Sequence, residues 1–267
     1  MWSDFIGYFL AILVGISLGL IGSGGSILTV PILVYILAIE PLMATLYSLF
    51  IVGTTSLVGG IQNALQRKVD FKTVFIFGIP SIASVYFTRA FLLPIVPDKL
   101  FTIAGFEFTK PIALMVLFAI VMIAASIAMI KPCVNCNDNE TKAIQFNYPM
   151  ILLNGIFVGI LTGLVGAGGG FLIIPSLVFF AKMPIKAAVG TSLFIISMNA
   201  LLGFAGSFQQ ATNIDWLLLL SFSALSVIGI FIGIFLSKRM DGSKLKSIFG
   251  WFVLLMGMYI LIKELTL

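Results

Sequence analysis

The chain of 267 residues is 60% hydrophobic and only 9% charged, and its formal net charge is +5. Because a soluble domain carries about 25% charged residues, this chain has too few polar groups to cover a water-facing surface. Its long apolar runs do not alternate with polar residues, which excludes an outer-membrane-type barrel. The composition therefore predicts an all-α integral membrane protein.

The sequence contains no histidine, so the commonest metal ligand and the usual proton shuttle are missing. Its acidic residues lie beside loops, near segment ends or at the termini, and none stands in the middle of an apolar run. We expect no catalytic residue, no metal ion, no cofactor and no nucleic-acid partner. The protein is therefore not expected to be an enzyme.

The apolar segments follow one another with short polar breaks between them. In chain order they cover residues 5–21, 27–38, 43–62, 72–93, 111–130, 148–165, 171–181, 186–207, 214–237 and 246–263. A full crossing needs roughly 20 apolar residues, so the segments 27–38 and 171–181 are too short and suit broken or re-entrant helices. The chain then makes about 8–10 spans.

A glycine-rich stretch occurs twice, at 15–31 and at 159–175. Its members match at a constant offset of 144 and include five glycines and a proline: Gly15, Gly19, Gly22, Gly24, Gly25 and Pro31 in the first copy, and Gly159, Gly163, Gly166, Gly168, Gly169 and Pro175 in the second. Further along, Ser48 to Ile51 matches Ser192 to Ile195, and Asp70 resembles Asp215. The sequence therefore predicts a duplicated five-segment unit, with repeats at 1–131 and 148–267 joined by a polar linker at 132–147.

Positive charge predicts the orientation, because cytoplasmic loops are rich in Lys and Arg. If each boundary switches sides, the larger set falls on one side: Arg67, Lys68, Lys72, Lys131, Lys142, Lys182, Lys186, Lys238, Arg239, Lys244 and Lys246. The smaller set falls on the other: Arg89, Lys99, Lys110 and Lys263. Both termini are then outside and the linker is cytoplasmic. Each repeat makes an odd number of crossings, which predicts two inverted repeats with a substrate site at their interface.

The glycine loops are the candidate substrate site. Non-helical backbone at membrane depth survives only when it is buried in protein or lines a cavity. The helix that follows each loop exposes unpaired N–H groups and a partial positive charge, which suits an anion. The residues assigned to substrate binding here are Ser23, Gly24, Gly25, Ser26, Gly168, Gly169 and Gly170. For Gly15, Gly19, Gly159 and Gly163 we favour close helix packing instead.

Small polar side chains in the third segment of each repeat could complete the site. They are Ser48, Thr55, Thr191, Ser192 and Asn199. An amide such as Asn199 needs a partner inside an apolar helix. The alternative for the serines and threonines is a hydrogen bond back to their own helix.

Two further features have a simpler interpretation. Arg89 lies near the end of its segment and is expected to snorkel to the membrane interface. The alternative for Arg89 is a vestibule that attracts anions. Cys133 and Cys136 form a lone CxxC in the linker, where a redox or intersubunit metal role is the alternative to a solvated linker.

The doubled glycine stretch, each copy followed by Pro31 or Pro175 and a short apolar segment, resembles the TauE/SafE family of sulfite and organosulfonate exporters. The resemblance runs from about Tyr8 to Ile262 and includes the stretch that ends at Ser192. It implies transport of small sulfur-containing anions, usually outward. The first copy departs from the pattern where Ser26 replaces the glycine found at Gly170, and where Tyr47 stands in place of Thr191.

We therefore expect a multi-pass transporter of the cell (inner or plasma) membrane that exports sulfite, sulfoacetate or other organosulfonates by alternating access. An anion channel, a transporter of small carboxylates and a membrane redox protein using Cys133 and Cys136 are the alternatives. The expected partners are the anion and the lipid bilayer, and a homodimer is left open.

Overall fold

The computed structural model describes residues 2–22, 25–103, 106–130, 148–166, 168–180, 183, 185–207, 214–237 and 242–266. The first repeat contains α1 (Trp2–Ile21), α2 (Ser26–Pro31), η1 (Ile32–Ile36), α3 (Pro41–Leu65), α4 (Phe71–Phe87), η2 (Thr88–Leu92), α5 (Leu93–Ile95), β1 (Lys99–Ile103), β2 (Phe106–Thr109) and α6 (Lys110–Ile130). The second contains α7 (Tyr148–Val165), α8 (Gly170–Phe180), α9 (Ile185–Ser207), α10 (Trp216–Ser237) and α11 (Gly242–Thr266). The all-α prediction is confirmed, and each predicted apolar segment is helical.

The predicted short segments are short in the structure. Helix α8 has 11 residues, and α2 has 6 residues followed by the 5-residue π-helix η1. One element was not predicted: β1 and β2 form an antiparallel hairpin where the sequence suggested a loop. The alternation of aromatic and polar residues around Phe101 and Phe108 is its signal in the sequence, and it is too short to stand out in an apolar chain.

The structure supports a multi-pass membrane protein. Within the described residues, five helices are long and apolar enough to span a bilayer: Pro41–Leu65, Phe71–Ile95, Lys110–Ile127, Ala187–Ser207 and Trp216–Ser237. Large apolar side chains lie exposed on the outside of the bundle, with Leu65 at 81% and Leu217 at 80% exposure. Such a surface is unfavourable in water and favourable against lipid.

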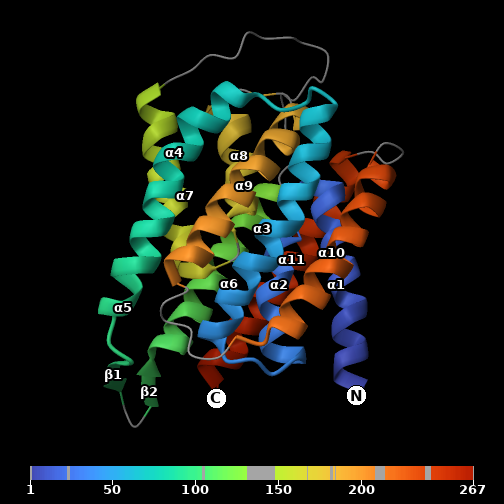
Figure 1. Cartoon of the computed structure of the whole chain (residues 1–267). Helices are drawn as coiled ribbons and strands as arrows, with labels where there is room; N and C mark the ends of the chain where they lie inside the picture. The colour runs from blue at the N-terminus through green and yellow to red at the C-terminus, as the bar shows by residue number, and fades with distance from the viewer. Residues whose placement is uncertain are drawn as a thin grey trace.

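The most extensive helix contacts join one repeat to the other (Figure 1). Helix α1 packs on α10, α7 on α4, α3 on α9 and α6 on α11. In Figure 1, α1 rises from the end marked N, whereas α7 starts at the opposite end of the bundle. Helices α3 and α9 are antiparallel, because Gly53 lies against Leu201 while Gly60 lies against Phe194. Helices from before and after the predicted linker are therefore interleaved in one bundle.

Equivalent hydrogen bonds tie the repeats together at two helix starts. The Asp70 N–H donates to the Thr191 hydroxyl at 3.0 Å, and the Asp215 N–H donates to the Tyr47 hydroxyl at 2.7 Å. The carboxylates of both aspartates accept from backbone N–H groups in the first turns of α4 and α10, as N-caps do. Because Tyr47 and Thr191 are equivalent at the offset of 144, each repeat supports the start of the other's fourth segment.

Candidate functional site

The two glycine loops start in the same way. The Gly22 N–H donates to the Leu18 carbonyl at 2.7 Å, and the equivalent Gly166 N–H donates to the Thr162 carbonyl at 2.9 Å. Gly22 and Gly166 have φ angles of +81° and +74°, which favour glycine because it lacks a Cβ. The glycine at this position therefore ends the first helix of each repeat. Ser23 and Gly24 lie outside the described residues.

Each glycine loop lies against the third segment of the other repeat. A Cβ on Gly22 would come within 2.5 Å of the Val189 side chain in α9, and a Cβ on Gly166 would overlap the side chain of Thr45 in α3. Val189 and Thr45 are themselves equivalent at the offset of 144. The loops are therefore held by reciprocal contacts across the repeat interface.

The second loop reaches the middle of the bundle at Gly168. A Cβ there would lie 2.9 Å from Val52 and 3.2 Å from Ile196, two fully buried and equivalent residues at the centres of α3 and α9. Gly168 has a φ of +67° and Gly169 a φ of +65°, and Gly170 begins α8. The loop thus places backbone and the start of α8 beside the centre of the α3–α9 pair.

The predicted residues of the first loop that the structure describes are also buried. Gly25 lies directly before α2, and Ser26 is its first residue, with no exposed surface. The Leu28 N–H donates to the Gly25 carbonyl at 3.1 Å, as the Leu172 N–H donates to the Gly169 carbonyl at 2.9 Å. The two helix starts share this hydrogen bond but differ in backbone, because Gly25 has a φ of −66° and the equivalent Gly169 a φ of +65°.

Most of the predicted small polar residues lie within about one turn of that centre. Thr55 and Ser192 are fully buried and donate to carbonyls of their own helices, Ile51 at 2.6 Å and Val189 at 2.9 Å. Ser48 is also fully buried, and its hydroxyl has no hydrogen-bond partner within the described part of the chain. Among these three hydroxyls, Ser48 is therefore the one whose O–H donor has no acceptor among the described residues.

Asn199 has the partner that its amide requires. Its Nδ2 donates to the Ser81 hydroxyl of α4 at 2.7 Å, and both residues are fully buried. Its amide oxygen has no hydrogen-bond partner among the described residues. The pair joins α9 to α4 and leaves one polar atom of Asn199 available. Thr191, also in α9, contacts the start of α4, where its hydroxyl accepts a hydrogen bond from the Asp70 N–H.

The packing interpretation of the remaining loop glycines is confirmed by their contacts. A Cβ on Gly15 would overlap the Ser226 carbonyl of α10, and a Cβ on Gly159 would lie 2.5 Å from the Ser81 carbonyl of α4. Gly19 meets Ile230 in the same way, and Gly163 meets Thr88. These glycines let α1 approach α10, and α7 approach α4, at backbone distance.

The expectation that Arg89 snorkels to the interface is wrong. Arg89 is 1% exposed, and its Nη1 donates to the Thr45 hydroxyl at 3.2 Å. A Cβ on Gly166 would lie 2.5 Å from Arg89 Nη2, so the guanidinium sits directly against the second glycine loop. Arg89 lies within about one turn of the end of the apolar run 72–93, so its position along the chain gave no signal that it would be buried.

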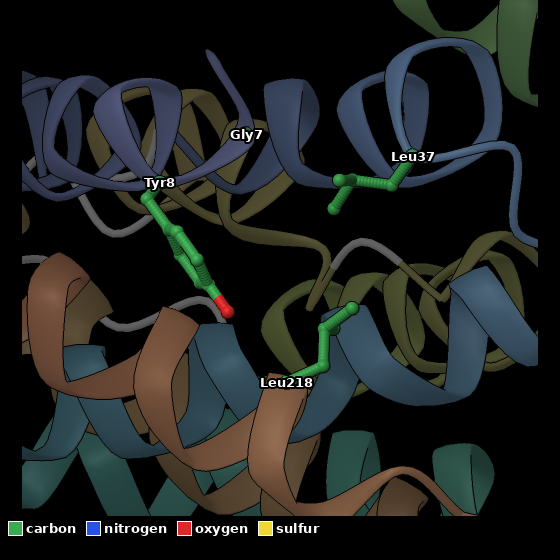
Figure 2. A pocket seen from close by; sticks show the side chains of 4 residues that line it. All are labelled: Gly7, Tyr8, Leu37 and Leu218. Carbon is green, nitrogen blue, oxygen red and sulfur yellow. The ribbon is translucent and has the colours of Figure 1, made fainter. Parts of the chain in front are cut away.

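A small hollow lies near the start of α1, away from the glycine loops (Figure 2). It is lined by Gly7, Tyr8, Leu37 and Leu218. Tyr8 is the polar member of the lining, and its hydroxyl accepts a hydrogen bond from Ser221 at 3.2 Å. Such a lining offers little to an anion. Within the described residues no cluster of acidic, cysteine or histidine side chains could hold a metal ion, and Cys133 and Cys136 lie outside those residues.

Comparison with known proteins identifies the family. The model of the family described as "Sulfite exporter TauE/SafE" matches residues 8–260. A "Probable membrane transporter protein" of Xylella fastidiosa is 26% identical over 93% of this chain and 91% of its own length. A probable membrane transporter protein of Methanocaldococcus jannaschii is 31% identical over 73% of this chain and 70% of its own length. Another, of Bacillus subtilis, is 26% identical over 93% of this chain and 93% of its own length. No solved structure matches. The chain therefore belongs to the TauE/SafE family of membrane transporters.

Proposed function

We propose that this protein is a secondary transporter that exports small sulfur-containing anions, such as sulfite, sulfoacetate or other organosulfonates, by alternating access. The observation that carries the proposal is the placement of the second glycine loop. Gly168 lies between Val52 and Ile196, at the centre of the two equivalent helices α3 and α9. Broken backbone at this depth has a physical reason if it lines the substrate path.

The proposed mechanism uses two inverted repeats. The antiparallel course of α3 and α9, and the reciprocal contacts of Gly22 with Val189 and of Gly166 with Thr45, support a pseudo-two-fold arrangement. In such a design one repeat rocks against the other around a fixed midplane site. Both chain ends lie at the same end of the bundle in Figure 1, and we assign that end to the outside of the cell (inner or plasma) membrane because the smaller set of positive charges belongs to it.

The proposed site suits an anion because of what surrounds it. Backbone N–H groups at the starts of α2 and α8 and hydroxyls such as Ser48 are hydrogen-bond donors, and donors stabilise negative charge. A negative ion that leaves a cell with a negative interior gains about 2.3 kcal/mol per charge per 100 mV. Export therefore requires no buried carboxylate for coupling.

This proposal predicts potential-dependent flux. Proteoliposomes are loaded with sulfite and given an interior-negative potassium diffusion potential, which drives the anion outward. Under this potential, sulfite efflux should be about tenfold faster than efflux from protein-free vesicles. Radiolabelled sulfite, a sulfonate and a small carboxylate are compared in parallel. Equal efflux from protein-free vesicles, or a carboxylate moving faster than both sulfur anions, would contradict the substrate assignment.

A further inference from the structure

The two glycine loops differ in the hydroxyl groups that lie beside them. A Cβ on Gly25 would overlap the hydroxyl of Ser17, but that hydroxyl donates to a carbonyl of its own helix at 2.8 Å. A Cβ on Gly169, the equivalent residue of the second loop, would overlap the hydroxyl of Thr162. Thr162 stands where the first repeat has Leu18. The hydroxyl beside the second loop therefore has no counterpart at the equivalent position of the first repeat.

The Thr162 hydroxyl is buried without a hydrogen bond. Thr162 is 1% exposed, and its Oγ1 has no hydrogen-bond partner among the described residues. A threonine within a helix can donate to its own backbone, as Thr55 does to the Ile51 carbonyl at 2.6 Å. A buried hydroxyl that is left unsatisfied destabilises the folded protein. A ligand that accepts from Thr162 would remove this cost.

The start of α8 lies at this hydroxyl. The Gly169 carbonyl accepts from the N–H groups of Leu172 at 2.9 Å and Ile173 at 3.2 Å, so Gly169 directly precedes the 11-residue helix. The first N–H groups of an α-helix have no partner within it, and they carry a partial positive charge. Because Thr162 lies against Gly169, its hydroxyl and this helix start are neighbouring hydrogen-bond donors. Donors of both kinds stabilise a negative ion.

A second hydroxyl without a partner comes from α3. Gly166 lies against Thr45, and Gly168 lies against Val52, so one face of α3 follows the loop. Ser48 is three residues after Thr45 and four before Val52, which places it on that face. Ser48 is fully buried, and its hydroxyl has no partner among the described residues. The second loop therefore has an unused hydroxyl donor on two of the helices that it touches, α3 and α7.

We propose that Thr162 donates a hydrogen bond to the transported anion at the start of α8 and, together with Ser48, selects an anion with three oxygens. The two hydroxyls belong to different helices, so they reach a bound group from different directions. A sulfite or sulfonate group has three oxygens that point in different directions from the sulfur, whereas a carboxylate has two in one plane. Thr162 is therefore a specificity-determining residue that carries no charge. This inference rests on the proposed function.

The test measures anion binding to the full-length chain purified in detergent, with sulfite, methanesulfonate and acetate as probes. The apparent Kd is obtained from the rise in unfolding temperature with anion concentration, since a ligand of the folded state raises apparent stability. Thr162→Val keeps the shape of the side chain and removes the hydroxyl. We expect it to weaken binding of sulfite and methanesulfonate about tenfold and binding of acetate less than about threefold. Thr162→Ser retains the hydroxyl and should bind all three anions within about threefold of wild type.

The unfolding temperature without anion separates a binding role from a structural one. Thr162→Val removes an unsatisfied buried hydroxyl, so the anion-free variant should unfold at a higher temperature than wild type. Loss of a structural hydrogen bond would lower that temperature instead. Ser223→Ala is the matched control, because the Ser223 hydroxyl is also buried without a partner among the described residues, in α10, which packs mainly on α1 and α3. It should raise the unfolding temperature in the same way and change each Kd less than about twofold.

Ser48→Ala provides a second variant, which should weaken methanesulfonate binding about threefold to tenfold. Wild-type affinity in Thr162→Val or Ser48→Ala would overturn the assignment, as would a lower unfolding temperature of anion-free Thr162→Val or the absence of a saturable shift in the wild type. If Thr162→Val binds like wild type while wild-type vesicles transport sulfite, the Thr162 site is wrong and the proposed function stands. Thr162-dependent binding without transport would give the reverse result.

Discussion

Gly168→Ala is expected to reduce sulfite flux about 10- to 100-fold while the protein still folds. A left-handed backbone costs a residue with a Cβ about 1–2 kcal/mol, and Gly168 has a φ of +67°. The added carbon would also lie 2.9 Å from Val52, closer than real Cβ contacts allow. The loop must therefore shift at the proposed substrate position, and each 1.4 kcal/mol lost there corresponds to about a factor of ten.

The control for this variant is Gly78→Ala in α4. A Cβ on Gly78 would meet Ile195 and Val74 at an ordinary 4.0 Å, and the residue is helical. Alanine there should raise stability by about 0.5–1 kcal/mol and leave flux unchanged. The measurement is initial flux per folded protein in proteoliposomes. If Gly168→Ala transports as fast as Gly78→Ala, the second glycine loop does not line the path.

Gly15→Val is expected to prevent correct assembly of the bundle. The Cβ of the valine would overlap the Ser226 carbonyl and lie 2.9 Å from the Gly229 Cα, so only backbone could move aside. Overpacking of this kind costs about 1–3 kcal/mol, and more where no flexible side chain can move. Gly159→Val should have a similar effect at the equivalent contact between α7 and Ser81 of α4.

The readout for these packing variants is the yield of monodisperse protein and its unfolding temperature in detergent. Gly78→Ala serves again as the control, because it adds a methyl group to a neighbouring helix without a close contact. A Gly15→Val protein with the wild-type unfolding temperature would show that α1 and α10 do not touch as closely as the structure places them. It would also remove the α1–α10 pair from the contacts that join the two halves of the chain.

The architecture could be predicted from the sequence because its signals are repeated. Apolar run lengths predicted the helices, and the fixed offset of 144 predicted that Gly22 and Gly166 would play the same role. The packing function of Gly15 and Gly159 followed from glycine spacing within helices. The hairpin of β1 and β2 was missed, since its strands have only 5 and 4 residues.

The site was harder to predict because it depends on contacts between repeats. Spacing along the chain shows that Thr45 and Val189 are equivalent, but not that each faces the other repeat's glycine loop. Spacing also does not show that Arg89 is buried. The Arg89 side chain is covered by α3 and the Gly166 loop, which lie far from it in the sequence. Nor does spacing show that the Thr191 hydroxyl, assigned to substrate binding, accepts a hydrogen bond from the Asp70 N–H, with Tyr47 in the equivalent place.

The most direct test of a carrier with one site shared by two repeats is counterflow. Proteoliposomes are loaded with unlabelled sulfite and diluted into a trace of radiolabelled sulfite, with valinomycin and equal potassium to hold the potential at zero. Alternating access predicts that the label accumulates transiently above its external concentration, with saturation as external sulfite rises, because each return step carries an anion. Label that equilibrates without overshoot, at a rate linear in sulfite concentration, would contradict the carrier mechanism and indicate a channel.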